Sequence, residues 1–413
     1  MKKKRKNQPK IVFILEIFPS LSQTFILNQI TGLIDLGYDI DILASYRPND
    51  EFVQNDVLKY GLLEKTNFFS SNSKGIYRIF KSLYSLFTNI IKLPKVIPKL
   101  FNLIREEKLK TSLESLVLVS FIGNKYDIIH CQFGNVGGIH GPTLKKAKVR
   151  GKLITSFYGY DITKKKFDKT FYRDLFYYGD LFLPICNYFK ENLVKLGCNP
   201  EKIKIHPLGI DTSRFKISER EKTNPQKVSI LSVGRLVEKK GHEYTIQAFS
   251  KLNKKIDNIE LSIVGEGRNN KKIKNLIKDL NLEKKIHLLG ALKREKVIKL
   301  YKNSQIFILC SVTSKKGSME GTPTVLLEAQ VMKLPVVSTL HSGIPEIVVD
   351  KKSGFLVPEK AVELISEKLE ILLKNPKKRV EMGNFGRRFV KENFDMKLLN
   401  RKLLKHYISI LRI

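Results

Sequence analysis

Short runs of β-branched and other apolar residues alternate with longer amphipathic segments along most of the chain. This alternation is typical of a parallel sheet whose strands are joined by helices, because parallel strands need a long crossover connection. At 413 residues the chain is too long for a single ordinary core, so we expect two such units. The sequence therefore predicts an α/β fold with two parallel-sheet domains.

In the first half, strands are predicted at residues 10–15, 39–43, 127–130, 152–156, 181–185 and 202–206. In the second half, they are predicted at 228–233, 259–264, 286–289, 305–309 and 335–338. Helices are expected at 23–36, 242–253, 270–280, 293–301, 324–332 and 359–374. A polar stretch at 218–226 shows neither the helical nor the strand periodicity of apolar residues and is the predicted linker. The predicted organisation is a first domain at 1–217, a second at 227–384, and a basic helical segment at 385–413.

The net charge is +35, from 75 Lys and Arg against 40 Asp and Glu. Such an excess attracts polyanions, namely nucleic acid, anionic membranes or phosphorylated substrates. Residues 76–110 mix basic and apolar side chains in the manner of amphipathic helices on a lipid surface. No nucleic-acid-binding motif is found, so nucleic acid is not an expected partner. Attraction to an anionic membrane and a merely lysine-rich, solvated surface both remain open.

The hydrophobic fraction of 42% and the charged fraction of 28% are those of a soluble globular protein. No apolar run approaches the roughly 20 residues that span a bilayer. The four cysteines have neither disulfide-framework nor zinc-ligand spacing; they are Cys131, Cys186, Cys198 and Cys310. We therefore expect reduced thiols in a cytoplasmic protein.

Two carboxylates, Glu320 and Glu328, stand eight positions apart in the run SMEGTPTVLLE at residues 318–328. Thr322 can cap a helix, and Pro323 suits its first position, so a helix N-terminus there would offer amides to a phosphate. Glu328 lies within an apolar run, where a charged group implies a binding partner. Its carboxylate can accept two hydrogen bonds from a vicinal diol, as in a nucleotide ribose.

The predicted strand 228–233 leads directly into a loop that begins with Gly234 and carries Arg235 and Lys240. Two cations at the carboxyl end of a strand suit a diphosphate, because Arg supplies a planar fork and Lys a point charge. The alternative is two solvated basic residues in a lysine-rich chain. The loop after the next strand contains Gly265 and Gly267, which permit close approach of the backbone.

These motifs, in this order, resemble retaining glycosyltransferases of family 4. That resemblance implies the GT-B fold, in which two Rossmann-like domains have parallel sheets facing a central cleft. The E-x7-E pair, the string GRLVEKKG at 234–241 and the loop SGIPE at 342–346 carry the resemblance, which covers residues 227–358.

The resemblance implies that Arg235 and Lys240 bind the donor diphosphate and stabilise the charge of the leaving group. It implies that Glu320 holds the transferred sugar and Glu328 the nucleoside. Further donor-site residues implied are Gly234, Gly265, Gly267, Gly321, Thr322 and Pro323, with Gly343 and Glu346 near the sugar. The donor is expected to be a UDP- or GDP-sugar. No metal cofactor is expected, because cations of the protein replace Mg²⁺.

In the first half, the run SLSQTFI at 20–26 resembles a block of exopolysaccharide enzymes of the colanic-acid type. There, Ser22 and Thr24 can donate hydrogen bonds to the donor phosphate or to the acceptor. Ser22 can equally cap the following helix.

A second motif of the first half, DIIHCQFG at 127–134, places His130 and Gly134 near the expected cleft, although a lone histidine is more often structural. Gly134, Gly137 and Gly138 are interpreted as a flexible turn that admits the acceptor. Gly209, in the last family segment of this domain, is expected to line the cleft together with Asp211.

Members of the family usually have F-H-G-x-D where this chain has FYGYD at 157–161, so Tyr158 replaces a histidine. A phenol, with a reference pKa near 10, cannot take up a proton at neutral pH. It can still donate a hydrogen bond to a sugar hydroxyl or a phosphate oxygen. Asp161 is retained and can bind the acceptor or orient the loop.

The resemblance thus implies a retaining, metal-independent transfer of a hexose to a glycan. The expected acceptor is a polyprenyl-linked oligosaccharide at the inner face of the membrane, where the protein would be peripheral. The C-terminal helix is expected to cross back to the first domain. Two alternatives are a nucleotide-sugar epimerase or hydrolase of the same fold, and a non-catalytic basic protein that binds membrane or nucleic acid.

Overall fold

The computed structural model describes residues 8–20, 23–48, 53–69, 117–123, 125–217 and 227–411. The predicted linker 218–226, the amphipathic segment 76–110 and Ser22 lie outside the described residues. The chain divides into two compact units. The first unit contains Met1–His206 and Asn400–Ile413, and the second unit contains Pro207–Leu399.

The first unit contains a six-stranded parallel sheet in the order β3-β2-β1-β4-β5-β6. Its strands are β1 (Ile11–Ile17), β2 (Ile40–Tyr46), β3 (Thr66–Phe68), β4 (Ile128–Gln132), β5 (Lys152–Phe157) and β6 (Leu181–Pro184). Most of their residues are buried, as in a sheet that helices cover on both faces. The strand order reverses direction between β1 and β4.

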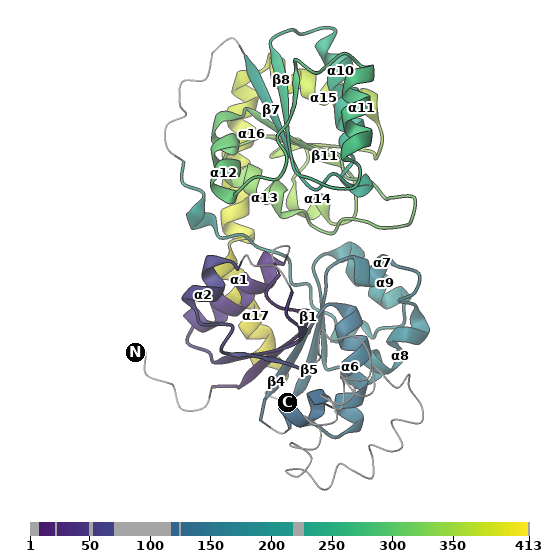
Figure 1. The fold of residues 1–413 in the computed structure, drawn as a ribbon, viewed down its shortest axis with the longest axis vertical. Helices are drawn as coiled ribbons and strands as arrows, with labels where there is room; N and C mark the ends of the chain where they lie inside the picture. Colours follow the sequence, from purple (N-terminus) through teal and green to yellow (C-terminus); the bar gives the residue numbers. More distant parts are fainter. Residues whose placement is uncertain are drawn as a thin grey trace. The chain divides into compact units, whose positions relative to one another are not determined.

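Helices cover both faces of this sheet (Figure 1). One face carries α1 (Thr24–Asp35), α2 (Asn55–Lys59) and most of α17 (Met396–Leu411); the other carries α6 (Gly134–Lys146), α8 (Lys169–Tyr178) and α9 (Asn187–Lys195). The helix α17 begins in the second unit and continues into the first, where Leu403 and Tyr407 are fully buried. Asn400 fixes it there, because its side-chain amide donates to the carbonyl of Asn28 on α1 at 3.1 Å.

The second unit repeats the architecture with the strand order β12-β11-β10-β7-β8-β9, again all parallel. The strands are β7 (Val228–Val233), β8 (Ile259–Val264), β9 (Ile286–Leu288), β10 (Ile306–Leu309), β11 (Val336–Thr339) and β12 (Gly354–Val357). One face packs on α10 (His242–Asn253), α11 (Asn270–Asp279) and α15 (Val362–Lys374), and the other on α12 (Arg294–Asn303), α13 (Thr324–Val331) and α16 (Pro376–Asn393).

Several predicted elements differ from the structure. Residues 202–206 are not a strand, because Pro200 starts a 3₁₀ turn (Pro200–Lys202) and only Ile203 forms a bridge, to Phe182. The short strands β3 and β12 were not predicted. The predicted helical segment 385–413 is two helices, because α16 ends at Asn393 and Asp395 pairs with Ile210 before α17 begins.

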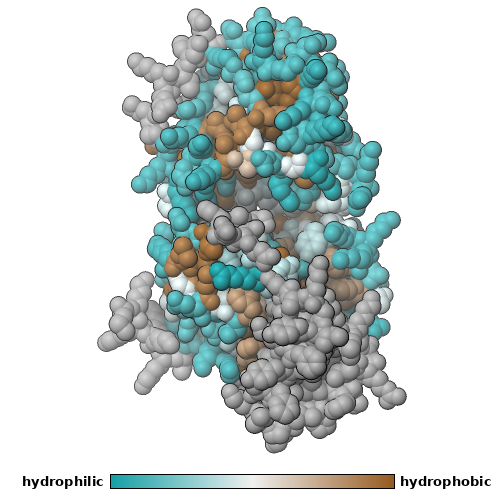
Figure 2. All heavy atoms as spheres, viewed as in Figure 1, coloured by the Kyte–Doolittle hydropathy of each residue, from teal (hydrophilic) through white to brown (hydrophobic). Residues whose placement is uncertain are grey.

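Hydrophilic side chains cover most of the described surface on the face shown in Figure 2. Among the described helices, none combines the length and the apolar character needed to cross a bilayer. The four cysteines are free and buried.

Candidate active site

The second unit has a topological switch point between β7 and β10. The chain runs outward from β7 through β8 and β9 and then returns to β10 on the other side. In open parallel sheets, ligands bind outside the carboxyl ends of the strands at such a point. The loop after β7 carries Arg235 and Lys240, and the loop after β10 carries Glu320. The fold therefore brings the predicted cations and the first glutamate to one edge of the sheet.

Glycines allow the loops after β7 and β8 to stack backbone against backbone. A Cβ atom on Gly265 would overlap the carbonyl of Gly234, and one on Gly267 would overlap that of Leu236. Gly265 also has a φ of +140°, which a side chain disfavours. The close approach that these glycines permit is thus to the neighbouring loop of the protein itself.

Glu320 forms the centre of a buried charge cluster. Lys240 Nζ lies 2.9 Å from its Oε2, and Lys239 Nζ lies 2.8 Å from its Oε1. Burial alone would raise the pKa of Glu320, but the two ammonium groups outweigh it and lower the pKa to about 2. The side chain is therefore a carboxylate at neutral pH, with two cations beside it.

The two cations predicted for a diphosphate have different surroundings. Lys240 is buried against Glu320, whereas Arg235 is exposed and its guanidinium makes no hydrogen bond or ion pair within the described residues. Lys239, which was not among the predicted site residues, also contacts Glu320 and donates to the carbonyl of Met319 at 3.1 Å. Because Lys239 and Lys240 are adjacent in a lysine-rich chain, the sequence does not indicate which of them contacts Glu320.

Glu328 lies on α13 and has partners from α12. Tyr301 donates its hydroxyl to Glu328 Oε2 at 3.2 Å, and Arg294 Nη2 lies 4.0 Å from Oε1. Burial raises the pKa of Glu328, although Arg294 and Tyr301 oppose the shift. No pattern in the sequence indicates Tyr301 or Arg294 as site residues, because their contact with Glu328 depends on how α12 packs beside α13.

The start of α13 differs from the prediction. The helix begins at Thr324, with Pro323 in the cap position and no side-chain cap. Thr322 therefore does not cap the helix, and its buried hydroxyl has no hydrogen-bond partner within the described residues. Gly321 is buried beside it. In the loop after β11, Gly343 precedes the short helix α14 (Ile344–Ile347), which contains the half-buried Glu346.

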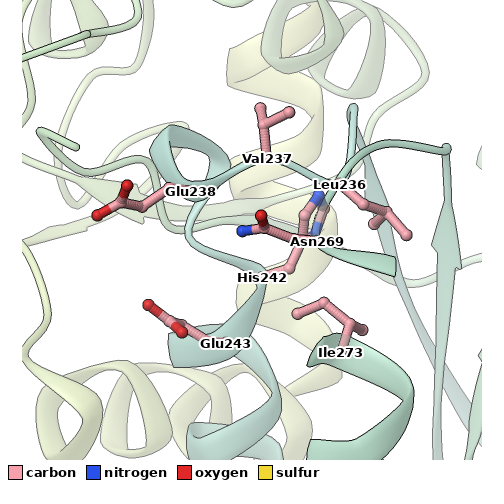
Figure 3. A pocket seen from close by; sticks show the side chains of 7 residues that line it. All are labelled: Leu236, Val237, Glu238, His242, Glu243, Asn269 and Ile273. Carbon is pink, nitrogen blue, oxygen red and sulfur yellow. The ribbon is translucent and has the colours of Figure 1, made fainter. Parts of the chain in front are cut away.

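A small hollow lies beside the loop after β7 (Figure 3). It has an empty volume of about 210 Å³, open to solvent, and is lined by Leu236, Val237, Glu238, His242, Glu243, Asn269 and Ile273. Both of its carboxylates already have partners: Glu238 accepts from the amide of Lys315 at 2.9 Å, and Glu243 pairs with Lys272. His242 is buried with its Nε2 3.2 Å from the carbonyl of Gly234. Its role is to support the Gly234 loop.

In the first unit, Asp161 fixes the loops after β4 and β5. Its carboxylate accepts hydrogen bonds from the amides of Gly134 at 2.7 Å, Gly159 at 2.7 Å and Tyr158 at 3.1 Å. Burial raises the pKa of Asp161, although these amides oppose the shift. Of the two roles considered for Asp161, the geometry favours orienting the loops.

Replacing Asp161 should therefore destabilise the protein. In Asp161→Asn, the new amide group would face backbone donors, and we expect the free energy of unfolding to fall by about 1–3 kcal/mol. Urea denaturation would measure this. Asp168→Asn is the matched control, because the exposed Asp168 side chain accepts only the amide of Phe171 in the described structure, and Asn caps a helix as well as Asp does. Equal stability losses in the two variants would contradict the assignment.

His130 is placed differently from the expectation that it lies near a substrate. Its side chain is fully buried, with Nδ1 2.6 Å from the hydroxyl of Tyr407 on α17 and Nε2 2.8 Å from that of Ser156. Burial lowers the pKa of His130 to about 3. The ring is not exposed to a ligand, because Tyr407 of α17 packs against it.

The glycines after β4 do not form a flexible turn. Gly134, Gly137 and Gly138 belong to α6, and Cβ atoms on them would overlap Phe157 and Thr155 of β5 and crowd Phe171 of α8. The glycines are needed because α6 packs closely on its neighbours. The interpretation as an acceptor entrance is therefore corrected.

Tyr158 remains at the carboxyl end of β5, partly exposed between two aromatic rings. The ring centroids of Phe25 and Phe133 lie 4.6 Å and 4.7 Å from its own. Its hydroxyl donates to Gln132, and burial raises the pKa of Tyr158 above its ordinary value. The phenol therefore stays protonated. Thr24 is exposed at the start of α1.

Gly209 and Asp211 fall within the second compact unit, Pro207–Leu399. A Cβ atom on Gly209 would crowd Leu399 and the carbonyl of Phe394. Asp211 caps a short 3₁₀ turn (Thr212–Arg214) and pairs with Arg214 at 2.8 Å. Both residues thus serve packing and local structure in the second unit.

Two family patterns match this chain. Residues 22–214 match the family described as Glycosyltransferase Family 4, and residues 213–389 match Glycosyl transferases group 1. The chain is 31% identical to the putative colanic acid biosynthesis glycosyltransferase WcaL of Salmonella typhimurium over 95% of its own length and 98% of the relative. It is 34% identical to the amylovoran biosynthesis glycosyltransferase AmsK of Erwinia amylovora, over 85% of the chain and 87% of the relative.

Among solved structures, Anabaena HepE in complex with UDP-glucose matches with a TM-score of 0.72 at 15% identity, covering 97% of this chain and all of that one. The fold is therefore GT-B, with two α/β units of the Rossmann type. The chain belongs to family 4 of the GT-B glycosyltransferases and is a glycosyltransferase.

Proposed function

We propose that the protein transfers a hexose from a UDP- or GDP-sugar, with retention of the anomeric configuration, to a glycan of a cell-surface exopolysaccharide. The observation that carries the proposal is the Glu320–Lys239–Lys240 cluster at the switch point of the second unit. The names of WcaL and AmsK place those relatives in exopolysaccharide biosynthesis, and HepE was solved with UDP-glucose, which supports the choice of donor and product.

In this proposal the second unit holds the donor. Arg235, exposed on the same loop as Lys240, and Lys240 itself bind the diphosphate and stabilise the charge that develops on it as the sugar leaves. Glu320 accepts hydrogen bonds from sugar hydroxyls, and Glu328 accepts them from the ribose. Because these cations belong to the protein, the reaction needs no metal ion to neutralise the leaving group.

The acceptor proposed is a polyprenyl-linked oligosaccharide at the inner face of the membrane, with the protein bound peripherally. The net charge of +35 supports this, because anionic lipid attracts basic surfaces. Binding to vesicles that contain anionic phospholipid, compared with vesicles of phosphatidylcholine alone, tests it. Equal binding to both would contradict the proposal.

A donor screen by thermal shift tests the nucleotide specificity. UDP-glucose, UDP-galactose, GDP-mannose, UDP and GDP are added separately, and one nucleotide series should raise the melting temperature. Free ligand at 100 times its dissociation constant stabilises by about 2.7 kcal/mol, which shifts a chain of this size by several degrees. Glu328→Ala should abolish the shift if its carboxylate binds the ribose.

The control for the donor screen is Glu260→Ala. Glu260 pairs with Lys227 near the amino ends of β7 and β8, away from the carboxyl edge that carries the site. This variant should keep the full thermal shift. No shift with any nucleotide, or rapid hydrolysis or epimerisation of the donor without acceptor, would contradict the proposed function.

A further inference from the structure

A chain of polar contacts crosses four neighbouring strand ends of the second unit. In the sheet order β12-β11-β10-β7, the loops after these strands supply Glu359, His341, Glu320 and the Lys239–Lys240 pair respectively. The lysines hold the carboxylate of Glu320. The other two residues, Glu359 and His341, act on its backbone.

Glu359 anchors the chain at its outer end. Its Oε2 accepts from the amide of Thr313 at 2.8 Å, and its Oε1 accepts from the Thr313 hydroxyl at 3.2 Å. The same Oε1 lies 2.5 Å from Nδ1 of His341. The loop after β12 is thereby tied to the loops after β10 and β11.

His341 connects this anchor to the site. Its side chain is fully buried, and its Nε2 accepts the backbone N–H of Glu320 at 3.0 Å. A backbone amide can only donate, so Nε2 carries no proton and Nδ1 carries it. Nδ1–H then donates to the Glu359 carboxylate. The hydrogen bond to Glu359 thus favours the tautomer of His341 whose Nε2 can accept the backbone N–H of Glu320.

We propose that His341 and Glu359 are positioning residues that hold the backbone of Glu320 in place for sugar transfer. Lys239 and Lys240 pull on the Glu320 carboxylate, and the loop that carries it, residues 310–323, has no helix or strand of its own. A fixed hydrogen bond to its amide restrains the peptide against that pull. The proposal rests on the proposed role of Glu320 toward the sugar.

Two substitutions separate this role from simple packing. In His341→Gln, the side-chain oxygen can reach the position of Nε2 and still accept from Glu320. In His341→Asn, the amide can only replace Nδ1, so the bond to Glu320 is lost while that to Glu359 can persist. Hydrogen exchange of the peptide at residues 318–322, measured without donor, should rise about tenfold or more in His341→Asn and little in His341→Gln.

Kinetics provide the second measurement. We expect His341→Asn to lower kcat about 10- to 100-fold with little change in the donor KM, because Glu328 and Arg235 are untouched. His341→Gln should retain most of the activity. Glu359→Gln should fall between them, because glutamine has one acceptor oxygen and cannot accept from both the Thr313 amide and His341 Nδ1–H. His206→Asn, at a buried histidine of the first unit, is the control for destabilisation and should leave kcat unchanged.

The proposal is overturned if the Asn and Gln variants exchange equally at residues 318–322, or if they lose kcat equally. Hydrogen exchange needs no donor, so it tests the positioning role separately. If His341→Asn alters the exchange but the protein binds no nucleotide sugar, the contact between His341 and the Glu320 amide is supported. The proposed function is then contradicted instead.

Discussion

Glu320→Gln should nearly abolish sugar transfer while leaving nucleotide binding in place. The substitution keeps the size of the side chain but removes the charge that Lys239 and Lys240 neutralise. Their positive charge would then be uncompensated in a buried site, and the hydrogen bonds to the sugar would weaken. Loss of one preorganised electrostatic group typically costs about 10²- to 10³-fold in kcat. Because Glu328 lies on α13 with partners of its own, the affinity for UDP or GDP alone should change much less.

The matched control for this prediction is Glu260→Gln. It removes a carboxylate that also pairs with a lysine, Lys227, but near the opposite edge of the same sheet. Steady-state kinetics with the donor found by thermal shift, together with calorimetry of nucleotide binding, measure both variants. A Glu320→Gln enzyme with kcat within threefold of Glu260→Gln would contradict a catalytic role for Glu320.

The folded protein should lose stability steeply as the pH falls below about 6.5. Four buried histidines have a pKa that burial lowers to about 3 or 4; they are His130, His140, His206 and His242. In the unfolded chain each would titrate near 6.5, so below that pH the unfolded state binds more protons and is favoured. Each contributes about 1.4 kcal/mol per pH unit between pH 6.5 and its folded pKa. This loss is large against a typical stability of about 5–15 kcal/mol.

Urea denaturation at pH values from 8 to 5 measures this dependence. The unfolding midpoint should be flat above pH 7 and fall below it. His206→Gln should reduce the dependence of the free energy of unfolding on pH by about 1.4 kcal/mol per pH unit, because glutamine does not titrate. Constant stability between pH 7 and 5 would show that these histidines are not buried as described.

The sequence was most informative where local pattern and fold agree. The bounds of β7, β8 and α10 were predicted to the residue. Glu328 was found because a carboxylate in an apolar run is unusual. By contrast, β12 was not predicted as a strand, because it begins at Gly354 and glycine is more typical of turns than of strands.

The contacts that depend on tertiary structure could not be predicted. His341 stands between Leu340 and Ser342 with no motif spacing, and its role appears only when β11 and β12 bring their loops together. His130 was expected near a substrate because nothing local indicates that Tyr407, 277 positions away, covers it. Gly134 was interpreted as part of a turn, because the sequence alone does not distinguish a glycine in a turn from a glycine in a close helix contact.

The position of α17 has a consequence for the order in which the chain folds. Leu403 and Tyr407 fill the core of the first unit, although that unit is otherwise made from residues before Pro207. While the protein is being synthesised, the first sheet must therefore wait for the whole second unit to leave the ribosome before its core can close. Until then its apolar face lacks its last helix, so we expect the nascent chain to expose apolar surface that favours aggregation.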